Sequence, residues 1–530
     1  MYSVGDAAWC LVGNGLSNQS FVRGPEGLIA IDTGDSIEEM RSALLELRRH
    51  TREPVVACIY THFHYVSGTQ AILEEDPSAD LQIYGHVGIE ENRRRFGAEV
   101  APRSNRGLVH QFGVLLPATG DDALLHCGLG PAYRNSAHAP HTPGYIPAQH
   151  QIREACTMRI AGLDVHITPA PSDATDSVTV WFPSLRVCAN NLIWPALFNV
   201  FAIRGEEYRD PRVVLQGIDH LLSLDPVALI GTHGPPIEGT EVVNGVTDYR
   251  DAIQYIWDQT VRGINKGLTL NELTEAVQLP QRFQRSYLTH QFYGLVEHHV
   301  RQIHSGLFGW FDEDESHLFP LPAADRHQRL IAGFGGREKV RTQISQAMAA
   351  EDWRWALELA TWLVRSAECE ASDRNLLANA LRAIAQHTLA ANVRNWCLTR
   401  ALELEGSLDL SRFRSHRFRD ADVLAAPPTQ YIDTLRVLLD PVAAAGLTCT
   451  IAWQFPRGER RGLQLREGVA IPCEARTADV ELGMSHETWA QILGGKLTMN
   501  SAIDAQLLSL QGDPALFERV MQAFEHPSFC

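Results

Sequence analysis

The sequence predicts a multidomain α/β protein, and three observations support this fold class. The chain has 530 residues, which is more than a single hydrophobic core usually organises. Residues 1–245 alternate short apolar strands with helical stretches, whereas residues 246–406 show helical periodicity without strands. Residues 407–530 combine strands and helices again, which is typical of a separate α+β domain. We therefore expect three domains with these bounds.

The first predicted domain is built from buried strands that end in turns. Gly27–Gly34 predicts a strand followed by a tight turn, and Ser36–His50 predicts a helix capped by Asp35 or Ser36. Further strands are predicted at Val55–Tyr60, Met158–Thr168, Val178–Phe182 and Val227–Ile230. The segment Ala101–His150 is rich in Gly, Pro and His, and a loop-rich insertion of this length is more often functional than idle.

The second and third predicted domains differ in their periodicity. Helices are predicted at Leu268–Val277, Phe283–Ser305, Arg337–Ala349, Trp353–Ser366 and Asp373–Leu404, the last long enough to contain a turn. The tryptophans at 353, 355 and 362 indicate packing between helices. In the third domain, strands are predicted at Thr448–Phe455, Arg461–Leu465, Gly468–Pro472 and Ala478–Leu482, and helices at Ser485–Leu493 and Pro514–Phe524.

The composition excludes several classes of partner. The net charge of −17 argues against binding to nucleic acid or to an anionic membrane, because both require a basic surface. No run of about 18 apolar residues predicts a membrane span, and the N-terminus lacks the pattern of a secretory signal. The ten cysteines are scattered without a C-x-x-C pair, which favours reduced thiols and a cytoplasmic location.

A histidine pair marks the predicted site. His62 and His64 follow an apolar strand at positions i and i+2, so both can converge on one metal ion. Asp32 ends the preceding strand, Pro171–Ser177 forms an acidic turn, and His233 follows a later strand. Strand ends in an α/β domain meet at one edge of the sheet, so we expect these groups to lie together and to form a metal-dependent active site.

The order strand-Asp-Thr-Gly, Thr-His-x-His, acidic turn, Gly-Thr-His-Gly resembles the metallo-β-lactamase fold. A further resemblance is carried by five segments: Asp173–Pro183, Asn190-Asn191, Phe201–Asp210, Tyr293–Arg301 and Leu307–Asp312. Through these segments the chain resembles, within that fold, the alkyl sulfatase family. The resemblance implies a metallo-β-lactamase-like αββα sandwich, then an all-α dimerisation domain, then an α+β domain like sterol carrier protein 2. It covers essentially the whole chain.

The resemblance places the metal ligands on His62, His64, Asp173 and His233. The Asp-His pair that holds a second zinc ion in the family falls on Val66 and Ser67, and a further Glu ligand falls on Asn190. We therefore expect one metal ion per chain. Two histidines and one carboxylate suit catalytic zinc, and they are also the ligand set of non-haem iron oxygenases. The sequence leaves open both the choice of metal and whether Asp173 or Asp176 is the ligand.

Four further residues are candidates for catalysis. Tyr65 is either a general acid or substrate contact, or it fills space beside the metal. Asp176 is either a second carboxylate for acid–base work or a cap of its turn. The resemblance places His298 and Arg301 at the substrate anion, and their i, i+3 spacing puts both on one helix face; the alternative is a solvated face. Asp32 is expected to orient a histidine ring or the turn.

Two other segments complete the interpretation. His138 and His141 lie in the insertion and are expected to be loop residues. Gly494–Asn500 and Gln511–Pro514 resemble the sterol-carrier pattern, in which an apolar tunnel receives an alkyl chain. This domain either does the same, or it covers the active-site mouth or stabilises a dimer.

These features predict a homodimeric metallohydrolase that acts on a sulfate ester or related anionic group of an organic substrate. The sequence does not identify the substrate: linear alkyl sulfates and a biosynthetic intermediate are both open. A non-haem iron redox enzyme at the same triad is one alternative, and a non-catalytic carrier of lipid-like ligands is another.

Overall fold

The computed structural model describes residues 1–97 and 99–529, which form two compact units. The larger unit comprises Met1–Arg93 and Gly107–Asp409, and the smaller comprises Arg94–Arg106 and Leu410–Cys530. Each unit has its own hydrophobic core and is described by itself.

The larger unit begins with a seven-stranded sheet in which the strands follow chain order. Its strands are β1 (Tyr2–Val4), β2 (Ala8–Leu11), β3 (Gln19–Gly24), β4 (Gly27–Ile31), β5 (Val55–Ile59), β6 (Gln82–His86) and β7 (His150–Ile152). β1 to β4 pair antiparallel, and β4 to β7 pair parallel. The strands predicted at Gly27 and Val55 are confirmed.

A six-stranded sheet packs against the first, in the order β13-β12-β11-β10-β9-β8. Its strands are β8 (Cys156–Ile160), β9 (Leu163–Pro169), β10 (Val178–Phe182), β11 (Val187–Asn190), β12 (Ala228–Gly231) and β13 (Ile237–Glu238). The single strand predicted over Met158–Thr168 is wrong, because β8 and β9 form a hairpin. Ala161 and Gly162 turn the chain there with φ of 48° and 77°, as a two-residue hairpin turn requires.

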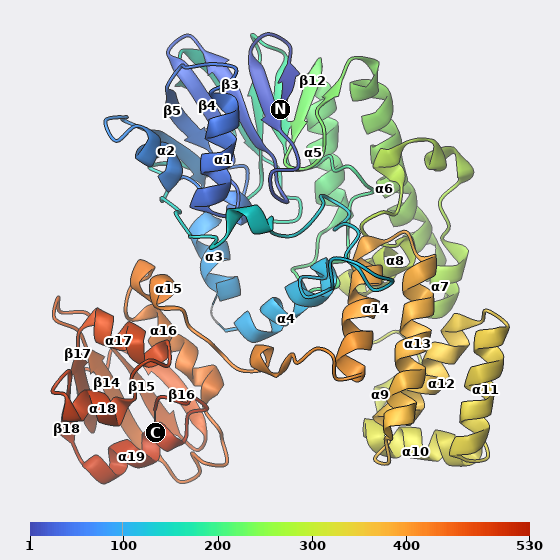
Figure 1. Ribbon diagram of the computed structural model, residues 1–530, viewed down its shortest axis with the longest axis vertical. Coiled ribbons are helices and arrows are strands. Elements are labelled where there is room, and N and C mark those ends of the chain that lie inside the picture. The colour runs from blue at the N-terminus through green and yellow to red at the C-terminus, as the bar shows by residue number, and fades with distance from the viewer. Residues whose placement is uncertain (98, 530) are drawn as a thin grey trace. The chain divides into compact units, whose positions relative to one another are not determined.

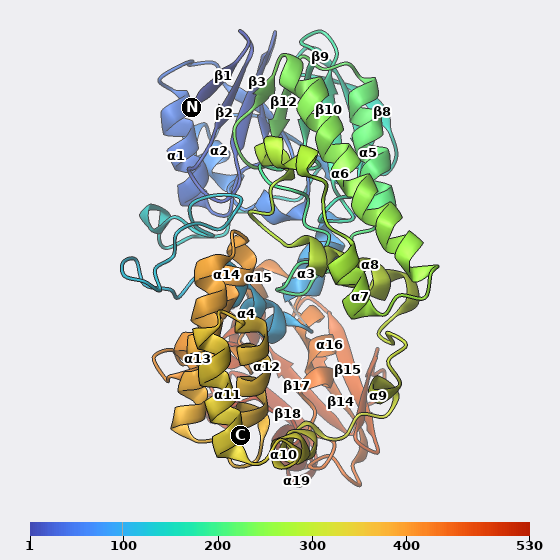
Figure 2. The ribbon, with the colours of Figure 1, turned by 90° about the vertical axis from the view of Figure 1, so that its right-hand side faces the viewer.

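Three layers of apolar contacts define an αββα sandwich (Figures 1 and 2). In β4, Leu28 and Ala30 pack toward helices α1 (Ile37–Leu47) and α2 (Gln70–Glu75), whereas Ile29 and Ile31 pack toward the second sheet. Helices α5 (Pro211–Ser223) and α6 (Thr240–Ile264) cover the outer face of that second sheet. The central strands β4, β5, β10, β11 and β12 are therefore largely buried on both faces, which explains their nearly continuous apolar sequences, whereas β8 and β9 alternate buried and more exposed residues.

Local sequence explains where the helices begin and end. Ser36 caps α1 by accepting a hydrogen bond from the Glu39 N–H, as one of the two predicted caps. The insertion after residue 100 opens with helix α4 (Ala101–Phe112) and becomes irregular only afterwards, up to β7. Helix α3 (Ile89–Gly97) precedes it.

The helical region starts before residue 246, where the sequence predicts it, because α6 begins at Thr240. It continues with α7 (Leu270–Ala276), α8 (Val296–Phe308), α9 (Glu315–Leu318), α10 (Ala323–Gly333), α11 (Arg337–Ala349), α12 (Trp353–Arg365), α13 (Ala371–His387) and α14 (Ala391–Leu404). The helix predicted over Phe283–Ser305 is shorter than expected, since two 3-10 turns precede α8. Trp355 and Trp362 of α12 lie edge to face with centroids 5.8 Å apart, and both contact Phe334 at the end of α10, so they take part in the packing between helices that their spacing predicts.

The smaller unit carries a five-stranded sheet in the order β16-β15-β14-β17-β18. Its strands are β14 (Thr448–Gln454), β15 (Arg460–Arg466), β16 (Val469–Cys473), β17 (Val480–Met484) and β18 (Leu508–Gly512). Its helices are α15 (Asp420–Ala425), α16 (Gln430–Thr434), α17 (His486–Leu493), α18 (Met499–Asp504) and α19 (Pro514–Gln522). Trp453 and Trp489 are fully buried between sheet and helices, so this unit is an α+β domain with its own core.

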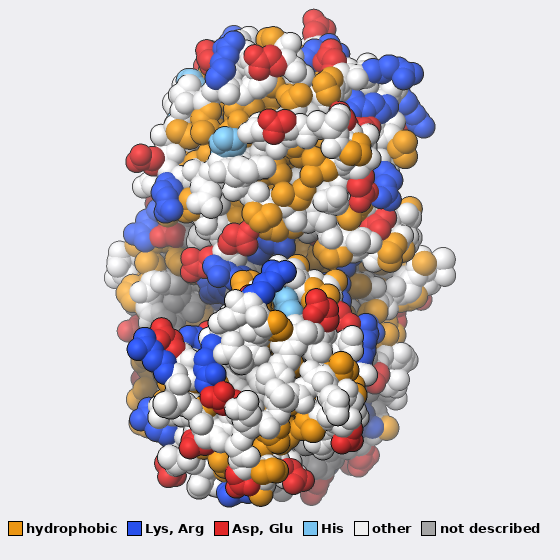
Figure 3. All heavy atoms as spheres, turned by 90° about the vertical axis from the view of Figure 1, so that its left-hand side faces the viewer, with side chains coloured by type: hydrophobic (Ala, Val, Ile, Leu, Met, Phe, Trp, Pro, Cys, Tyr) orange, Lys and Arg blue, Asp and Glu red, His pale blue; other side chains and the backbone are white. Residues whose placement is uncertain are grey.

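Among the described helices, none has the length and apolar character needed to cross a bilayer. Figure 3 shows acidic and basic side chains interspersed over the face that it displays.

Candidate metal and anion site

The ends of β5 and of the β9–β10 connection bring three predicted metal ligands together. β5 ends at Ile59, and a 3-10 turn at Phe63–Tyr65 follows His62 and contains His64. Asp173 lies between β9 and β10, and its Oδ2 is 3.2 Å from Nδ1 of His64. One ligand atom from each of His62, His64 and Asp173 lies within 4.8 Å of the others. The predicted triad is therefore assembled in the structure.

His62 is held with one ring nitrogen free. The Thr61 N–H and hydroxyl donate to the two carboxylate oxygens of Asp32, at 2.7 and 2.6 Å, and Thr61 Oγ1 lies 2.9 Å from Nδ1 of His62. Burial raises the pKa of Asp32 to about 7. Thr61 Oγ1 donates its only proton to Asp32, so toward His62 it can only accept. The Thr61 oxygen then accepts from Nδ1–H, which leaves the His62 Nε2 lone pair exposed to the site.

The free nitrogen fits a metal ion. Nε2 of His62 is buried and has no hydrogen-bond partner. Burial lowers the pKa of His62 to about 3, so the ring is neutral. A buried neutral imidazole with an unpaired acceptor, beside a second histidine and a carboxylate, is the donor set of a metal site in which neighbouring groups orient the ligands.

Asp173 is ionised and oriented by an asparagine. Burial raises its pKa, but the rings of His62 and His64 outweigh burial and hold that pKa well below its usual range. Asn191 Nδ2 donates to Asp173 Oδ1 at 2.6 Å. The resemblance places a further carboxylate ligand of the family at Asn190. The amide oxygen of Asn190 accepts hydrogen bonds from the N–H groups of Leu192 and Ile193, so it is engaged in its own turn. Asn191 is thus the residue at the site.

Tyr65 contacts both His62 of the triad and His233. Its ring is nearly perpendicular to both histidines, with centroids 5.3 Å from His62 and 5.5 Å from His233. His233 donates from Nδ1 to the Leu16 carbonyl at 3.0 Å, and burial lowers its pKa to about 4. Among the described residues, His233 is outside the group of close ligand atoms. The structure therefore gathers three of the four predicted metal residues.

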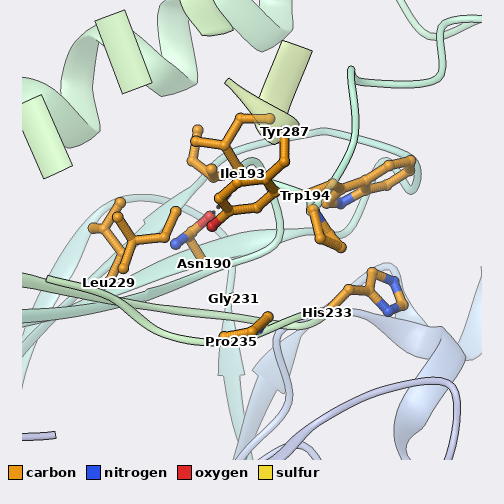
Figure 4. A pocket seen from close by; sticks show the side chains of 11 residues that line it. Asn190, Ile193, Trp194, Leu229, Gly231, His233, Pro235 and Tyr287 are labelled. Atoms are coloured by element: carbon orange, nitrogen blue, oxygen red, sulfur yellow. Dashed lines mark hydrogen bonds between the residues drawn. The ribbon is translucent and has the colours of Figure 1, made fainter. Parts of the chain in front are cut away.

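His233 borders a small pocket. Figure 4 shows His233 beside Trp194 at one end of this pocket and Leu229 at the other. The Asn190 side chain also lines it, and its Nδ2 is buried without a partner. The free space suits about one water molecule.

Asp176 is buried next to the triad and is only partly satisfied. Asn92 Nδ2 donates to its Oδ1 at 2.6 Å, whereas Oδ2 has no hydrogen-bond partner. Burial raises the pKa of Asp176 to about 6. Val66, at a position where the resemblance implies a ligand of a second metal ion, is fully buried in the core under α1 and offers no ligand atom.

Two arginines that the sequence interpretation did not assign approach the triad from the loop between β11 and α5. Arg209 is 3% exposed and donates from Nη1 to the Asn199 carbonyl at 2.8 Å, while its Nε and Nη2 are buried without partners. Burial lowers the pKa of Arg209, and the nearby Asp173 charge opposes this effect. Arg204 pairs with Glu206 at 2.6 Å and also contacts the Tyr293 hydroxyl. Both guanidinium groups lie over aromatic rings. The Arg209 group is 5.7 Å from the Trp194 ring centroid, and the Arg204 group is 5.7 Å from the Phe112 ring centroid.

The predicted anion residues on α8 make different contacts. His298 is edge-on to Phe201, with centroids 5.7 Å apart, so it borders the loop that carries the arginines. The described hydrogen bond of Arg301 goes to Asn271 Oδ1 at 2.9 Å. His299, which was not predicted, is fully buried and contacts Asn199. In the insertion, His138 binds the Asn14 carbonyl, and His141 lies in a turn, so both are loop residues as expected.

Comparisons with known proteins identify the family. Residues 269–407 match the family described as alkyl sulfatase dimerisation, and residues 419–529 match alkyl sulfatase C-terminal. The chain is 34% identical over 466 residues to a linear primary-alkylsulfatase of Pseudomonas sp. (strain ATCC 19151), covering 85% of this chain and 87% of that one. It is 27% identical to an (R)-specific secondary-alkylsulfatase of Pseudomonas sp., covering 94% and 76%.

The fold agrees with these relatives. The solved structure of the stereoselective inverting sec-alkylsulfatase Pisa1 from Pseudomonas sp. superposes with a TM-score of 0.87 at 25% identity, covering all of this chain and 85% of that one. These similarities confirm the predicted family and fold, and they favour neither the redox enzyme nor the carrier. The likeness of the C-terminal domain to sterol carrier protein 2 stays a prediction. The chain belongs to the alkyl sulfatase family and is a hydrolase with the metallo-β-lactamase fold.

Proposed function

We propose that the protein hydrolyses the sulfate ester of an organic, alkyl-type substrate at a site that holds one metal ion. The observation that carries this proposal is Arg209, a buried guanidinium group with two unpaired N–H donors near the His62/His64/Asp173 triad. Arginine presents N–H donors in a planar fork that suits an oxyanion. A sulfate group held there would place its ester bond beside the metal site.

The metal ion that suits this chemistry is zinc, on His62 Nε2, His64 and Asp173. Bound zinc acts as a Lewis acid and lowers the pKa of a coordinated water to about 7. The chain's part is to orient the ligands: Asp32 and Thr61 fix the His62 ring, and Asn191 fixes the Asp173 carboxylate. Iron remains the second candidate, because the same ligand types bind it.

One ion per chain is proposed because the second site lacks ligands. Val66 is apolar, Asn191 is neutral, and the Tyr65 ring packs against both His62 and His233. In this arrangement the buried positive charge beside the triad comes from Arg209 and Arg204. His233 is then a support for Tyr65 and Trp194, against whose rings it packs edge-on.

Roles for the remaining predicted residues follow from their positions. Tyr65 contacts the rings of both triad histidines and is proposed to bind or protonate the substrate oxygen. Asp176 has an unpaired carboxylate oxygen and is proposed as the second acid–base group. His298 borders the arginine loop and is proposed to face the sulfate, whereas Arg301 is proposed only as an outer contribution to positive charge.

A homodimer and a small anionic substrate are the proposed partners. Residues 269–407 match the dimerisation family, and exposed apolar side chains gather within this region at Phe308, Trp310 and Phe319. Exposed aromatic residues of this kind favour a protein contact. Light scattering on the wild type and on Trp310→Ser tests this: a dimer that the substitution weakens supports the proposal, and a monomeric wild type contradicts it. The cytoplasmic location stays a prediction.

The activity is tested by incubating zinc-loaded protein with a linear primary alkyl sulfate, a secondary alkyl sulfate and the matching alkyl phosphate. Release of inorganic sulfate, and no release of phosphate at comparable rates, supports the proposal. Failure to release sulfate from either ester, in protein with its metal bound, contradicts it.

A further inference from the structure

Two contacting residues hold three buried donors that no group in the described chain satisfies. The donors are Nε and Nη2 of Arg209 and Nδ2 of Asn199. Arg209 Nη1 donates to the Asn199 carbonyl at 2.8 Å, so the two residues are direct neighbours. Each buried donor without a partner destabilises the folded protein, and a tetrahedral oxyanion offers acceptors for all three.

The direction of the Asn199 amide depends on His299. Nε2 of His299 lies 3.1 Å from Asn199 Oδ1. A carbonyl oxygen can only accept, so Nε2 must carry the proton. Burial lowers the pKa of His299 to about 3, so the ring is neutral and its Nδ1 holds a lone pair. If residue 299 had no donor, the Asn199 side-chain amide could turn and present its oxygen to the anion in place of Nδ2.

Gly294 leaves the space in which this contact forms. A Cβ at residue 294 would lie 2.1 Å from Asn199 Oδ1 and 2.9 Å from His299 Nε2. No side chain fits there without separating the two residues. His299 itself lies in the first turn of α8, directly after the loop that contains Gly294.

We infer that His299 is a positioning residue for sulfate binding: its Nε2–H holds the Asn199 amide so that Nδ2 joins Arg209 in binding the anion. This inference rests on the proposed function. It adds a residue whose role is to fix the direction of a neighbour, and His299 itself does not touch the substrate.

The test compares His299→Leu, which cannot donate, with His299→Gln, which keeps a donor on a side chain of similar reach. The dissociation constant for inorganic sulfate is measured by calorimetry on metal-loaded protein, beside kcat and KM for an alkyl sulfate. For His299→Leu we expect sulfate affinity to fall by about tenfold or more, with a matching rise in KM and a smaller change in kcat. His299→Gln should stay within about threefold of the wild type.

Asn199→Asp provides a second variant of nearly unchanged size. It replaces Nδ2 by an oxygen and should weaken sulfate binding at least as much as His299→Leu does. If His299→Leu folds poorly, Asn199→Asp still tests whether Nδ2 binds the anion. Sulfate binding by His299→Leu at wild-type affinity overturns the inference. So does equal weakening by the leucine and glutamine variants at unchanged Tm, because the ring shape would then matter and the donor would not.

Failure of the proposed function gives a different pattern. If Arg209→Met binds sulfate as the wild type does, the anion site itself is wrong, and the role of His299 falls with it. If Arg209→Met loses binding while His299→Leu keeps it, only the inference about His299 is overturned.

Discussion

Replacing Arg209 by methionine should separate function from stability. The side chain is 3% exposed and makes one described hydrogen bond, to the Asn199 carbonyl. Two N–H groups buried without partners cost about 1 to 3 kcal/mol each, and the lost charge-assisted bond contributes about 1.5 to 3 kcal/mol. The two unpaired groups together cost about 2 to 6 kcal/mol, a range that overlaps the contribution of the lost bond and mostly exceeds it, so without anion we expect a Tm close to or above that of the wild type. Methionine fills similar space beside Trp194.

The same substitution should remove most of the sulfate binding. Two charge-assisted hydrogen bonds to the anion are worth about 3 kcal/mol or more together, which corresponds to a loss of at least about 100-fold in affinity and in kcat/KM. Calorimetry with inorganic sulfate and sulfate-release kinetics measure both. Arg159→Met, at an exposed pair with Asp164, is the matched control and should change neither. An Arg209→Met variant that is much less stable yet still binds sulfate would refute the reasoning.

Two further predictions concern the groups around the site. Thr61→Val removes the hydroxyl that links Asp32 to His62 and should weaken metal affinity by about 10- to 100-fold, whereas Thr61→Ser should retain it; competition with a chelator measures this, and equal affinity in Thr61→Val contradicts it. Burial raises the pKa of Glu39 from its ordinary value of 4.5 to about 8, with the Asp35 charge adding to the effect. Between these values the folded state holds a proton that the unfolded state has released, so the free energy of unfolding should fall as pH rises, by at most about 1.4 kcal/mol per pH unit. Glu39→Gln should remove this part of the pH dependence in denaturant titrations from pH 5 to 8, and parallel curves for the two proteins would contradict the assignment.

Much of the fold and the clustering of His62, His64 and Asp173 could be predicted because their signals are local. Apolar runs bounded by turn residues identify β4 and β5, and the histidine pair follows directly from the end of β5. The acidic turn precedes β10, which pairs beside β9 and β11 in the second sheet. Parallel and antiparallel strands that end at one edge bring their terminal residues together, so the triad needed no long-range information beyond strand order.

Other parts of the site depend on register and on irregular backbone. Asn190 and Asn191 follow one another at the end of β11, where successive side chains point in opposite directions, so a shift of one residue changes which of them faces Asp173. Arg204 and Arg209 lie in a loop without periodicity, and no pattern in the sequence indicates where their guanidinium groups point. The contacts of the Tyr65 ring with His62 and His233 are likewise a result of packing.

The central claim is that one metal ion binds to His62, His64 and Asp173 in a hydrolase of the alkyl sulfatase family. Elemental analysis of protein purified without chelator tests it most directly, with His62→Ala and His233→Gln as paired variants. The account predicts about one zinc ion per chain in the wild type. It also predicts loss of zinc in His62→Ala and retention in His233→Gln. Two ions per chain, or a single ion that His62→Ala leaves in place, would contradict the account.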